Sequence, residues 1–431
     1  MLKFEVVIVG AGPAGLAAAY TLAKAGVEVA VFERGDHPGA KNLMGGVLYR
    51  QPTEEVLPGF YREAPLERPV VEQRLWILTE DDALTLGYRS RAFAGEPYNA
   101  FTVFRSRFDR WFGQKVVEAG ALLITETVVE DLLWENGRVV GVRTGRPQGD
   151  VRAEAVILAE GVNSLLTQKA GLKKGGLQTH ELAVAVKEVL ALPKEKIEDR
   201  FGLEEGQGCT IELLGEATLG MMGVGFIYTN KDTLSVGVGV LLSHLVRRRL
   251  NPNDVLEHLK NHPSVRKFLA GAQPKEYLAH LIPEGGFRSI PKLYGPGLLV
   301  AGDAAMLVNG IHREGSNLAL ISGKLAAETL LEVRTRGGYH EKNLSRYREK
   351  LEKSFVLQDL RKYQNTSLFF NENPQFFTLY PRLLSLAARE FLTVDSVPKR
   401  EKQRKIWQII TSHRSRWKLA QDLFRLWRVL G

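Results

Sequence analysis

The sequence predicts an α/β protein in which a Rossmann-like nucleotide-binding sheet carries an inserted α+β layer. Two segments carry this prediction: VVIVGAGPAG at residues 6–15 and LLVAGDAAMLVNGIHREGSN at residues 298–317. Each has an apolar strand, a glycine turn and the start of a helix, which is the element that binds nucleotides in such sheets. Because the two segments lie far apart in the chain, they suggest one large cofactor between them, which favours FAD over NAD.

The N-terminal segment has the parts of a dinucleotide site. FEVVIVG predicts a buried parallel strand, and LAAAYTLAKAG predicts a helix that ends at Gly26. Between them, the glycines allow a tight turn, a close approach of backbone to a pyrophosphate, and close packing of helix on strand. Amide groups and the dipole at the start of the helix then hold the phosphates. The residues expected to bind the cofactor here are Gly10, Ala11, Gly12, Pro13, Ala14 and Gly15.

A second strand, VEVAVFE, ends at Glu33, where a carboxylate can accept hydrogen bonds from ribose hydroxyls. Glu33 argues against NADP, because it would repel a 2′-phosphate. A structural glycine turn is the alternative, but the strand, helix, second strand and acid together favour dinucleotide binding. Next come Arg34 and the pair Gly45 and Gly46 in GAKNLMGGVL, which indicate backbone packed against a flat ring, or else a surface loop.

The middle of the chain continues the nucleotide-binding sheet. VFRSRFDRWFGQKVVEAG (103–120) predicts a helix, and residues 125–144 predict two strands around the turn at Asn136 and Gly137. Residues 156–159 predict another buried strand, followed by Gly161, a further candidate for cofactor contact. We assign residues 1–70, 101–175 and 286–335 to a discontinuous FAD-binding domain.

The remaining residues have other patterns. Residues 71–100 and 176–285 predict a mostly antiparallel sheet with helices. We assign these residues to the domain that binds the quinone or other substrate. Within it, residues 223–242 predict two strands around a polar turn, and NPNDVLEHLKNHPSVRKFL (251–269) predicts a helix capped by Asn251. Residues 336–431 predict a helical C-terminal region.

Composition separates the end of the chain from its body. The net charge is +9, and residues 398–431 hold ten Lys and Arg against two acidic residues, with three of the six tryptophans. In this tail Ile406, Ile410, Trp417, Phe424 and Trp427 recur at helical spacing and predict one apolar stripe opposite a basic face. Such a helix lies on a membrane surface, packs on the protein's own body, or packs against a partner subunit. Nucleic acid is not expected, because the body offers no binding fold.

The single cysteine, Cys209, indicates a reducing cytoplasmic compartment and cannot hold an iron-sulfur cluster, which needs several thiolates. No metal site is predicted.

Four segments together resemble the FixC family, relatives of the electron-transfer flavoprotein:quinone oxidoreductases. They are GAKNLMGG (39–46), IPEGGFRSIPKLYGPGLLVAGDAA (282–305), GIHREGSNLALISGKLAAE (310–328) and YREKLEKSFVLQDLRKYQN (347–365). The resemblance implies an FAD flavoprotein of the glutathione-reductase-like superfamily. It implies that the first glycines and Glu33 bind the ADP half, that Asp303, after Gly302, contacts the ribitol or pyrophosphate, and that Arg107 lies near the cofactor.

At the second motif, the amides of Gly315, Ser316 and Asn317 begin a helix. Their partial positive charge would face the pyrimidine end of the flavin ring and favour negative charge there. Tyr228, His312 and Arg313 are further pocket candidates on position alone.

The resemblance also implies a function and partners. Electrons would arrive from the alpha and beta subunits of an electron transfer flavoprotein and leave for a membrane quinone. Because one cysteine builds no cluster, a separate ferredoxin-like iron-sulfur subunit (FixX-type) is expected, as in the FixABCX complexes, where electron bifurcation is thought to occur. The protein would then be peripheral on the inner face of the cell membrane. The alternatives are a flavin-dependent prenyl-lipid reductase or hydroxylase, and a flavin-bearing relay subunit without catalysis of its own.

Overall fold

The computed structural model describes residues 2–40 and 46–431, which form two compact units. The first unit comprises residues 1–69, 96–182 and 280–364, and the second comprises residues 70–95, 183–279 and 365–431. The C-terminal region that the sequence predicts as helical is helical, and it divides between the units at residues 364 and 365. Each unit is described by itself below.

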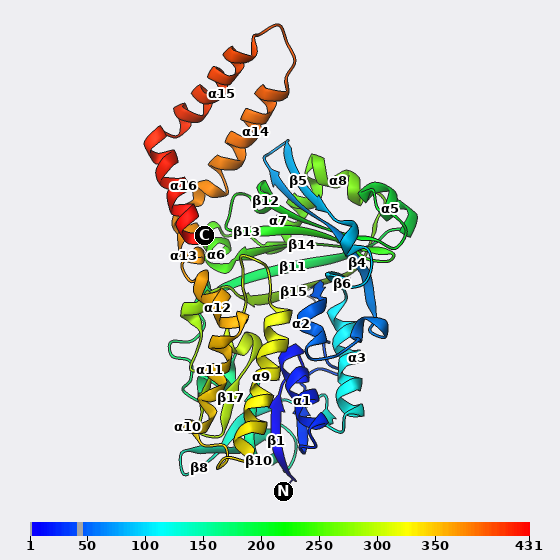
Figure 1. Ribbon diagram of the computed structural model, residues 1–431, viewed down its shortest axis with the longest axis vertical. Helices are drawn as coiled ribbons and strands as arrows, with labels where there is room; N and C mark the ends of the chain where they lie inside the picture. Colours follow the sequence, from blue (N-terminus) through cyan, green and yellow to red (C-terminus); the bar gives the residue numbers. More distant parts are fainter. Residues whose placement is uncertain (1, 41–45) are drawn as a thin grey trace. The chain divides into compact units, whose positions relative to one another are not determined.

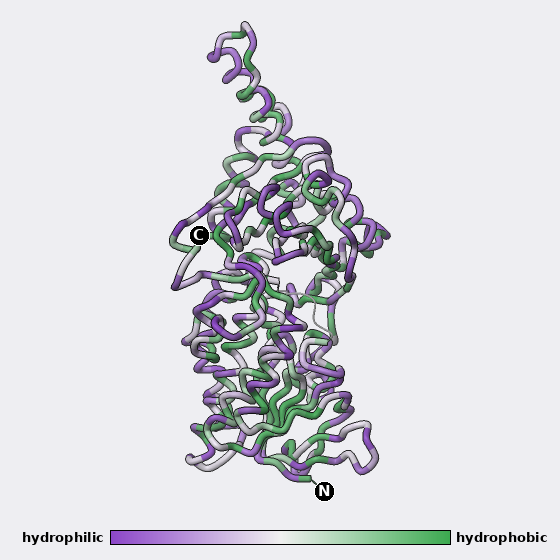
Figure 2. The backbone as a smooth tube through the Cα atoms, turned by 90° about the vertical axis from the view of Figure 1, so that its right-hand side faces the viewer, coloured by the Kyte–Doolittle hydropathy of each residue, from purple (hydrophilic) through white to green (hydrophobic). Residues whose placement is uncertain are grey.

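The first unit is built on a largely parallel sheet (Figure 1). Its strands are ordered β16 (Tyr294–Gly295), β17 (Leu298–Val300), β10 (Asp150–Leu158), β1 (Leu2–Val9), β2 (Val29–Phe32) and β7 (Leu122–Ile124). All neighbours from β17 to β7 pair in parallel, which explains why their sequences are continuous apolar runs. Figure 2 shows this part, next to the N-terminus, as neighbouring stretches of hydrophobic backbone. The predicted strand pair around Asn136 and Gly137 is confirmed as β8 (Val129–Glu135) and β9 (Arg138–Thr144).

Helices α1 (Pro13–Lys24) and α9 (Ser316–Arg334) pack against each other with their backbones in contact. A Cβ atom on Gly323 would overlap the carbonyl oxygen of Ala14, and one on Gly302 would lie 2.8 Å from the Cβ of Ala14. The turn before α1 is equally tight, since Gly10 has φ +99° and a Cβ there would overlap the Ala159 carbonyl. The two predicted strand-turn-helix elements therefore meet at the first turn of α1.

The second unit contains a mixed sheet with helices. Strands β11 (Leu182–Ala191), β14 (Thr233–Leu241), β13 (Gly223–Thr229) and β12 (Gly208–Gly215) pair antiparallel, as predicted. The parallel pairing of β12 with β4 (Leu66–Leu78) is the exception, and β5 (Ala83–Arg89) adds an antiparallel edge strand. The sheet packs with α5 (Lys194–Phe201), α6 (Leu242–Arg248), α7 (Pro252–Asn261) and α8 (Pro263–Leu269).

One predicted helix of this unit is two helices. The Asn251 cap is confirmed, because its side chain accepts a hydrogen bond of 2.9 Å from the Asn253 amide. The single helix over residues 251–269 is wrong, because the chain leaves helical geometry at His262, whose side chain accepts a hydrogen bond from the Ser264 amide and caps the next helix at Pro263.

The basic tail also differs from the prediction. It forms α15 (Lys399–His413) and α16 (Arg416–Leu430), separated by Arg414 in extended geometry, so the single stripe from Ile406 to Trp427 does not form. Before it come α13 (Thr366–Glu372) and α14 (Leu379–Leu392). Among residues 2–40 and 46–431, no helix has both the length and the apolar composition that crossing a bilayer requires.

The backbone contact between α1 and α9 predicts a sharp response to a small substitution. Gly323→Val should lower the free energy of unfolding by about 3 kcal/mol or more, because its side chain overlaps the Ala14 carbonyl and neither backbone can move without displacing a helix. Chemical denaturation of the purified variant measures this loss. Glu328→Ala, on the same helix but partly exposed, is the control and should change stability by less than about 1 kcal/mol. Equal stability of the Gly323 variant and the wild type would contradict the contact.

Candidate functional site

The loop that begins α1 leaves room for a phosphate group. The Gly10 amide donates to the Phe32 carbonyl at 2.8 Å, which fixes the loop to the end of β2. Among the residues that the structure describes, no side chain caps α1, and a Cβ on Gly12 would meet nothing within 4 Å. The amides of the first turn therefore face open space at the positive end of the helix dipole, as an anion site requires.

Glu33 lies at the end of β2 and binds this loop directly. Its carboxylate accepts hydrogen bonds from the Ala11 amide at 2.9 Å and from the Gly35 amide at 2.7 Å. Because a carboxylate has about four acceptor positions, it retains capacity for hydroxyl donors. The acid thus holds the loop in place in addition to the ribose contact expected from the sequence. Arg34, beside it, is exposed.

The second motif brings an unpaired carboxylate to the same region. β17 leads into a short 3₁₀ turn, η6 (Gly302–Ala305), whose Gly302 amide donates to Ser322 Oγ at 3.0 Å. Burial raises the pKa of Asp303 to about 6, against the opposing effect of the Arg105 charge. Among the described residues, the Asp303 carboxylate has no hydrogen-bond partner, so it is available to a ligand.

The start of α9 is connected to α3 (Arg105–Glu118) by one arginine. Arg105 donates to Ser316 Oγ at 2.7 Å and holds Asp109 with two hydrogen bonds of 2.9 and 2.8 Å. Both partners of the Arg105 and Asp109 pair are buried. Next to Ser316, the Asn317 side-chain oxygen is buried and has no hydrogen-bond partner in the described part of the chain. An unsatisfied acceptor of this kind fits a bound group that donates to it.

Arg107, which the resemblance would place near the cofactor, lies elsewhere on α3. Its side chain is 67% exposed, reaches Glu67 at 3.4 Å and lies over the Phe104 ring. The arginine that contacts the start of α9 is Arg105, which our sequence analysis missed. The signal was present, because Asp109 follows Arg105 by four residues and such pairs meet on a helix.

Four other predicted glycines have different settings. Gly45 lies outside the described residues. Gly46 is buried, and its carbonyl accepts from the Val103 amide at 3.0 Å. Gly161 follows β10 with open space around it, and the neighbouring Glu160 binds the amides of Leu166 and Thr167 at 2.9 and 2.7 Å. Gly315 adopts the cap position of α9.

Of the pocket candidates, His312 and Arg313 belong to the first unit and Tyr228 to the second. His312 Nε2 lies 2.9 Å from the Tyr363 hydroxyl, and its neighbour Arg313 has a left-handed backbone with φ +56°. Tyr228 belongs to β13 in the second unit, where its ring stacks on Phe226 at 4.9 Å.

The structure adds two ionisable groups that the sequence did not single out. The Glu284 carboxylate packs against Gly310 so closely that any side chain there would overlap it, and burial raises the pKa of Glu284 to about 7. Burial lowers the pKa of His280, and the charges of Arg105 and Arg34 act in the same direction. Sequence patterns miss both groups, because the contacts are made by residues distant in the chain.

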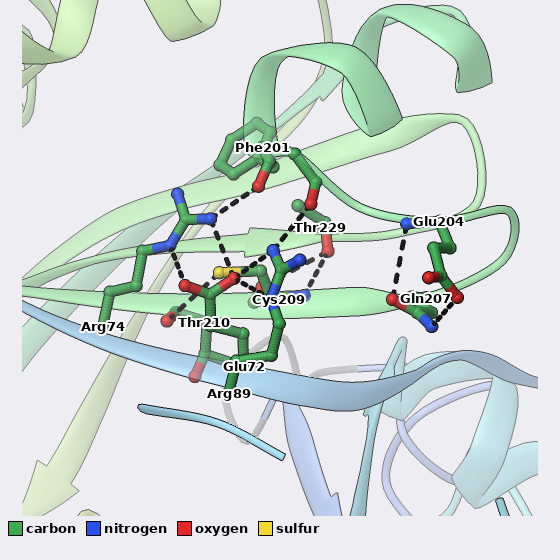
Figure 3. Close-up of polar contacts among 10 residues, drawn as sticks. Glu72, Arg74, Arg89, Phe201, Glu204, Gln207, Cys209, Thr210 and Thr229 are labelled. Atoms are coloured by element: carbon green, nitrogen blue, oxygen red, sulfur yellow. Dashed lines mark hydrogen bonds and ion pairs between the residues drawn. The ribbon is translucent and has the colours of Figure 1, made fainter. Parts of the chain in front are cut away.

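The polar residues of the second unit form a different kind of cluster (Figure 3). Glu72 binds Arg74 and Arg89, with its closest oxygens 2.9 and 2.5 Å from their nitrogens. Both arginines also donate to backbone carbonyls, of Phe201 and Gly202. Burial raises the pKa of nearby Cys209 to about 12, so the thiol stays protonated. Glu72 and the two arginines therefore join β4 and β5 to the end of α5. Across the described ranges, no three His, Cys, Asp or Glu side chains are placed to hold a metal ion.

The first unit therefore offers what FAD needs: an open helix start at Gly12, an acid at Glu33, an available Asp303 and an unsatisfied Asn317.

Comparison with known protein families also identifies a nucleotide-binding domain in this chain. Residues 8–42 match the NAD(P)-binding Rossmann-like domain, and residues 366–431 match the ETF-QO/FixC family C-terminal domain.

The full chain is similar to proteins named FixC. It is 48% identical over 429 residues to that of Azotobacter vinelandii, covering 99% of both chains. It is 45% identical over 432 residues to that of Rhizobium meliloti, again covering 99% of both. The chain belongs to the FixC family.

FixC membership and the ETF-QO/FixC domain make the chain an FAD-dependent oxidoreductase. Among solved structures, a geranylgeranyl bacteriochlorophyll reductase-like protein from Thermoplasma acidophilum aligns with a TM-score of 0.75 at 22% identity, covering 99% of this FixC chain and 100% of that protein. A flavin-dependent brominase aligns with a TM-score of 0.67 at 18% identity, covering 87% of this chain and 89% of that one. These two likenesses show the fold alone.

Gly12 allows a test of the phosphate position. Gly12→Ala should leave the unfolding free energy of FAD-free protein within about 1 kcal/mol of wild type, because the added methyl group meets no atom of residues 2–40 and 46–431. It should weaken FAD binding at least tenfold, because the methyl group occupies the space through which the backbone approaches the pyrophosphate. Titration of FAD into the apoprotein measures both affinities. Unchanged affinity would place the pyrophosphate elsewhere.

Glu284 predicts a dependence of stability on pH. Its pKa rises from 4.5 to about 7 on folding, so the folded protein binds this proton more tightly than the unfolded chain does. The contribution to stability is present below the unfolded pKa and is lost as pH rises towards 7, by up to about 3 kcal/mol. Glu284→Gln has no such proton, so its stability should increase relative to wild type between pH 5 and 8, as urea denaturation at each pH measures. If the difference in stability between Glu284→Gln and wild type is the same at every pH from 5 to 8, the raised pKa of Glu284 is wrong.

Proposed function

We propose that this FixC chain passes electrons from an electron transfer flavoprotein, through its FAD, to a membrane quinone. The observation that carries the proposal is the full-length likeness to FixC proteins together with the ETF-QO/FixC domain at residues 366–431. We further propose that it works in a complex of the FixABCX type, in which electrons from NADH are bifurcated. On this proposal the fold belongs to the glutathione-reductase-like superfamily.

The proposed cofactor contacts follow the geometry of the first unit. FAD, when bound, supplies the exchange of one or two electrons. The helix start at Gly12 holds its phosphates, and Glu33 accepts from its ribose. Asp303 holds the ribitol or pyrophosphate, and the α9 amides favour negative charge at the flavin ring. The full proposed set is Gly10, Ala11, Gly12, Pro13, Ala14, Gly15, Glu33, Arg34, Gly45, Gly46, Gly161, Gly302, Asp303, Gly315, Ser316 and Asn317, with Arg105 in place of Arg107.

The proposed partners supply the functions that the chain's own residues do not. The only cysteine is buried with a raised pKa, so these 431 residues cannot ligate an iron-sulfur cluster. A ferredoxin-like subunit would supply it. No second G-x-G-x-x-G motif follows a strand, which supports delivery of electrons by the two electron transfer flavoprotein subunits rather than by direct NADH binding.

A prenyl-lipid reductase is the second candidate, because the Thermoplasma protein with the same fold is described as geranylgeranyl bacteriochlorophyll reductase-like. That likeness is of fold, at 22% identity, whereas the FixC likeness reaches 48%. The electron-transfer proposal is therefore favoured.

The decisive experiment follows the flavin spectrum. The chain is purified with its co-expressed partners, and reduced electron transfer flavoprotein is added without oxygen. The FAD absorbance should bleach, and a quinone analogue should restore it with formation of quinol. No bleaching, with turnover of a prenyl lipid instead, would reject the proposal.

Two arginines give a matched pair for this assay. Arg105→Lys keeps the charge but loses the paired hydrogen bonds to Asp109, so flavin reduction should slow at least tenfold or FAD content should fall. Arg107→Lys, at an exposed position on the same helix, should retain the wild-type rate. If Arg107→Lys slows flavin reduction and Arg105→Lys does not, Arg107 is the arginine that contacts the cofactor.

A further inference from the structure

The loop between Asp303 and the start of α9 ends in a narrow hairpin. The Asn309 amide donates to the Glu314 carbonyl at 2.8 Å, and the Glu314 amide donates to the Asn309 carbonyl at 3.0 Å. The Cα atoms of residues that exchange two such bonds lie about 5.5 Å apart. Gly310, at the tip of the hairpin, is therefore held close to Gly315 and the first turn of α9.

The Glu284 carboxylate covers this tip. Strand β15 (Gln273–Pro283) ends just before Glu284, whose amide donates to the Glu181 carbonyl at 2.7 Å. A Cβ atom on Gly310 would overlap Glu284 Oε2 and lie 3.0 Å from Glu284 Cδ. The carboxylate thus has a fixed place against the hairpin, and a glycine at position 310 leaves the room for it.

Within the described part of the chain, nothing neutralises the Glu284 carboxylate. No side chain there donates a hydrogen bond to it or forms an ion pair with it. The charged groups on the segments packed against Glu284 belong to the short 3₁₀ turn before β11 and to the hairpin, and none of them pairs with it: Glu181, His312, Arg313 and Glu314. A carboxylate that serves only the fold is normally hydrogen-bonded or paired when it leaves water. Glu284 has instead the setting of a group that exchanges a proton, and it is half-buried, so part of its surface remains accessible.

A buried donor lies next to Gly310. Asn309 is 2% exposed, and its Oδ1 accepts from the amides of Ile311 and His312 at 3.2 and 3.4 Å. Its Nδ2 is buried and has no acceptor among the residues that the structure describes. A ligand with an acceptor oxygen would satisfy this nitrogen. The hairpin therefore combines an unused donor with the Glu284 acid, and a carbonyl oxygen can accept from both.

We propose that Glu284 is the catalytic acid that protonates the quinone as it is reduced beside this hairpin. The inference rests on the proposed function, which supplies the quinone and its two electrons. Reduction of a quinone to a quinol also consumes two protons. For each proton, the O–H bond of the Glu284 carboxyl group breaks and an O–H bond forms at a quinone oxygen. The carboxylate then takes a proton from solvent, so two cycles deliver both protons.

Two electron acceptors separate proton transfer from electron transfer. FAD-loaded protein is reduced with stoichiometric dithionite without oxygen, then mixed with a short-chain ubiquinone or with ferricenium, which takes one electron and no proton. Glu284→Gln keeps the shape of the side chain without its acidic proton, so it should reduce the ubiquinone more slowly by about 100-fold or more. It should reduce ferricenium at the wild-type rate, as the flavin absorbance in a stopped-flow instrument measures.

Glu181→Gln is the matched control. It removes one carboxylate from the segment that binds the Glu284 amide, while the backbone carbonyl that accepts this bond is unchanged. Its rates with both acceptors should equal those of wild type. FAD content and melting temperature, measured for every variant, should match wild type.

The pH dependence is a readout that a purely structural role would not change. Because the protonated form is the donor and the pKa of Glu284 is about 7, the wild-type rate with ubiquinone should fall as pH rises from about 6 to about 9. Glu284→Gln should show no such fall. Glu284→Asp retains an acid that is one methylene farther from Gly310, so it should keep the fall at a lower rate.

The outcomes distinguish this proposal from the proposed function. If wild type reduces both acceptors and Glu284→Gln either matches it or slows equally with both, the catalytic role of Glu284 alone is overturned. If wild type reduces ferricenium but no ubiquinone, the proposed function is rejected, and the role of Glu284 with it. If Glu284→Gln loses FAD, Glu284→Asp decides, and a wild-type rate in that variant overturns the proposal.

Discussion

The backbone contact between α1 and α9 is the constraint on which the rest of the structure depends. Ala14 lies in the first turn of α1, and both Gly302 and Gly323 approach it more closely than any side chain would allow. The two glycine turns are therefore placed by backbone atoms, which have no rotamers to adjust. A long cofactor that is held at both ends needs such a fixed spacing, because an error in one turn would displace the other end.

Polar contacts then hold the two glycine turns in place. Glu33 holds the loop before α1 through the Ala11 amide, and Arg105 holds the start of α9 through Ser316. Each contact joins an end of the site to a different element, β2 in one case and α3 in the other. Because Arg105 is buried with Asp109 as its partner, its charge is balanced within the protein and still influences Asp303 and His280. Within residues 2–40 and 46–431, the Asp303 carboxylate and the buried Asn317 oxygen have no hydrogen-bond partner, so both are available to a ligand.

Sequence patterns predicted the parts of this arrangement that are local. Gly10, Glu33 and the turn before α9 are recognisable because strand, turn and helix follow one another directly in the chain. Tertiary contacts account for what the sequence did not show. The tail forms two helices because Arg414 leaves helical geometry and binds Asp422. Arg105 and Arg107 lie on the same helix, but Arg105 is on its buried side and Arg107 is on its exposed side. Glu284 acquires its unusual environment from Gly310, which lies on another segment and has no local signature.

The same fold occurs in a reductase-like protein and in a brominase, so the cofactor frame alone does not determine the reaction. Specific chemistry must come from groups around that frame and from the surfaces that meet partners. In this chain the family-specific match covers residues 366–431, which include α16 and the Asp422 contacts that hold it to α14. These contacts join α16 to α14 and to the end of α15 within the second unit, so the family-specific match falls on helices outside the cofactor frame of the first unit.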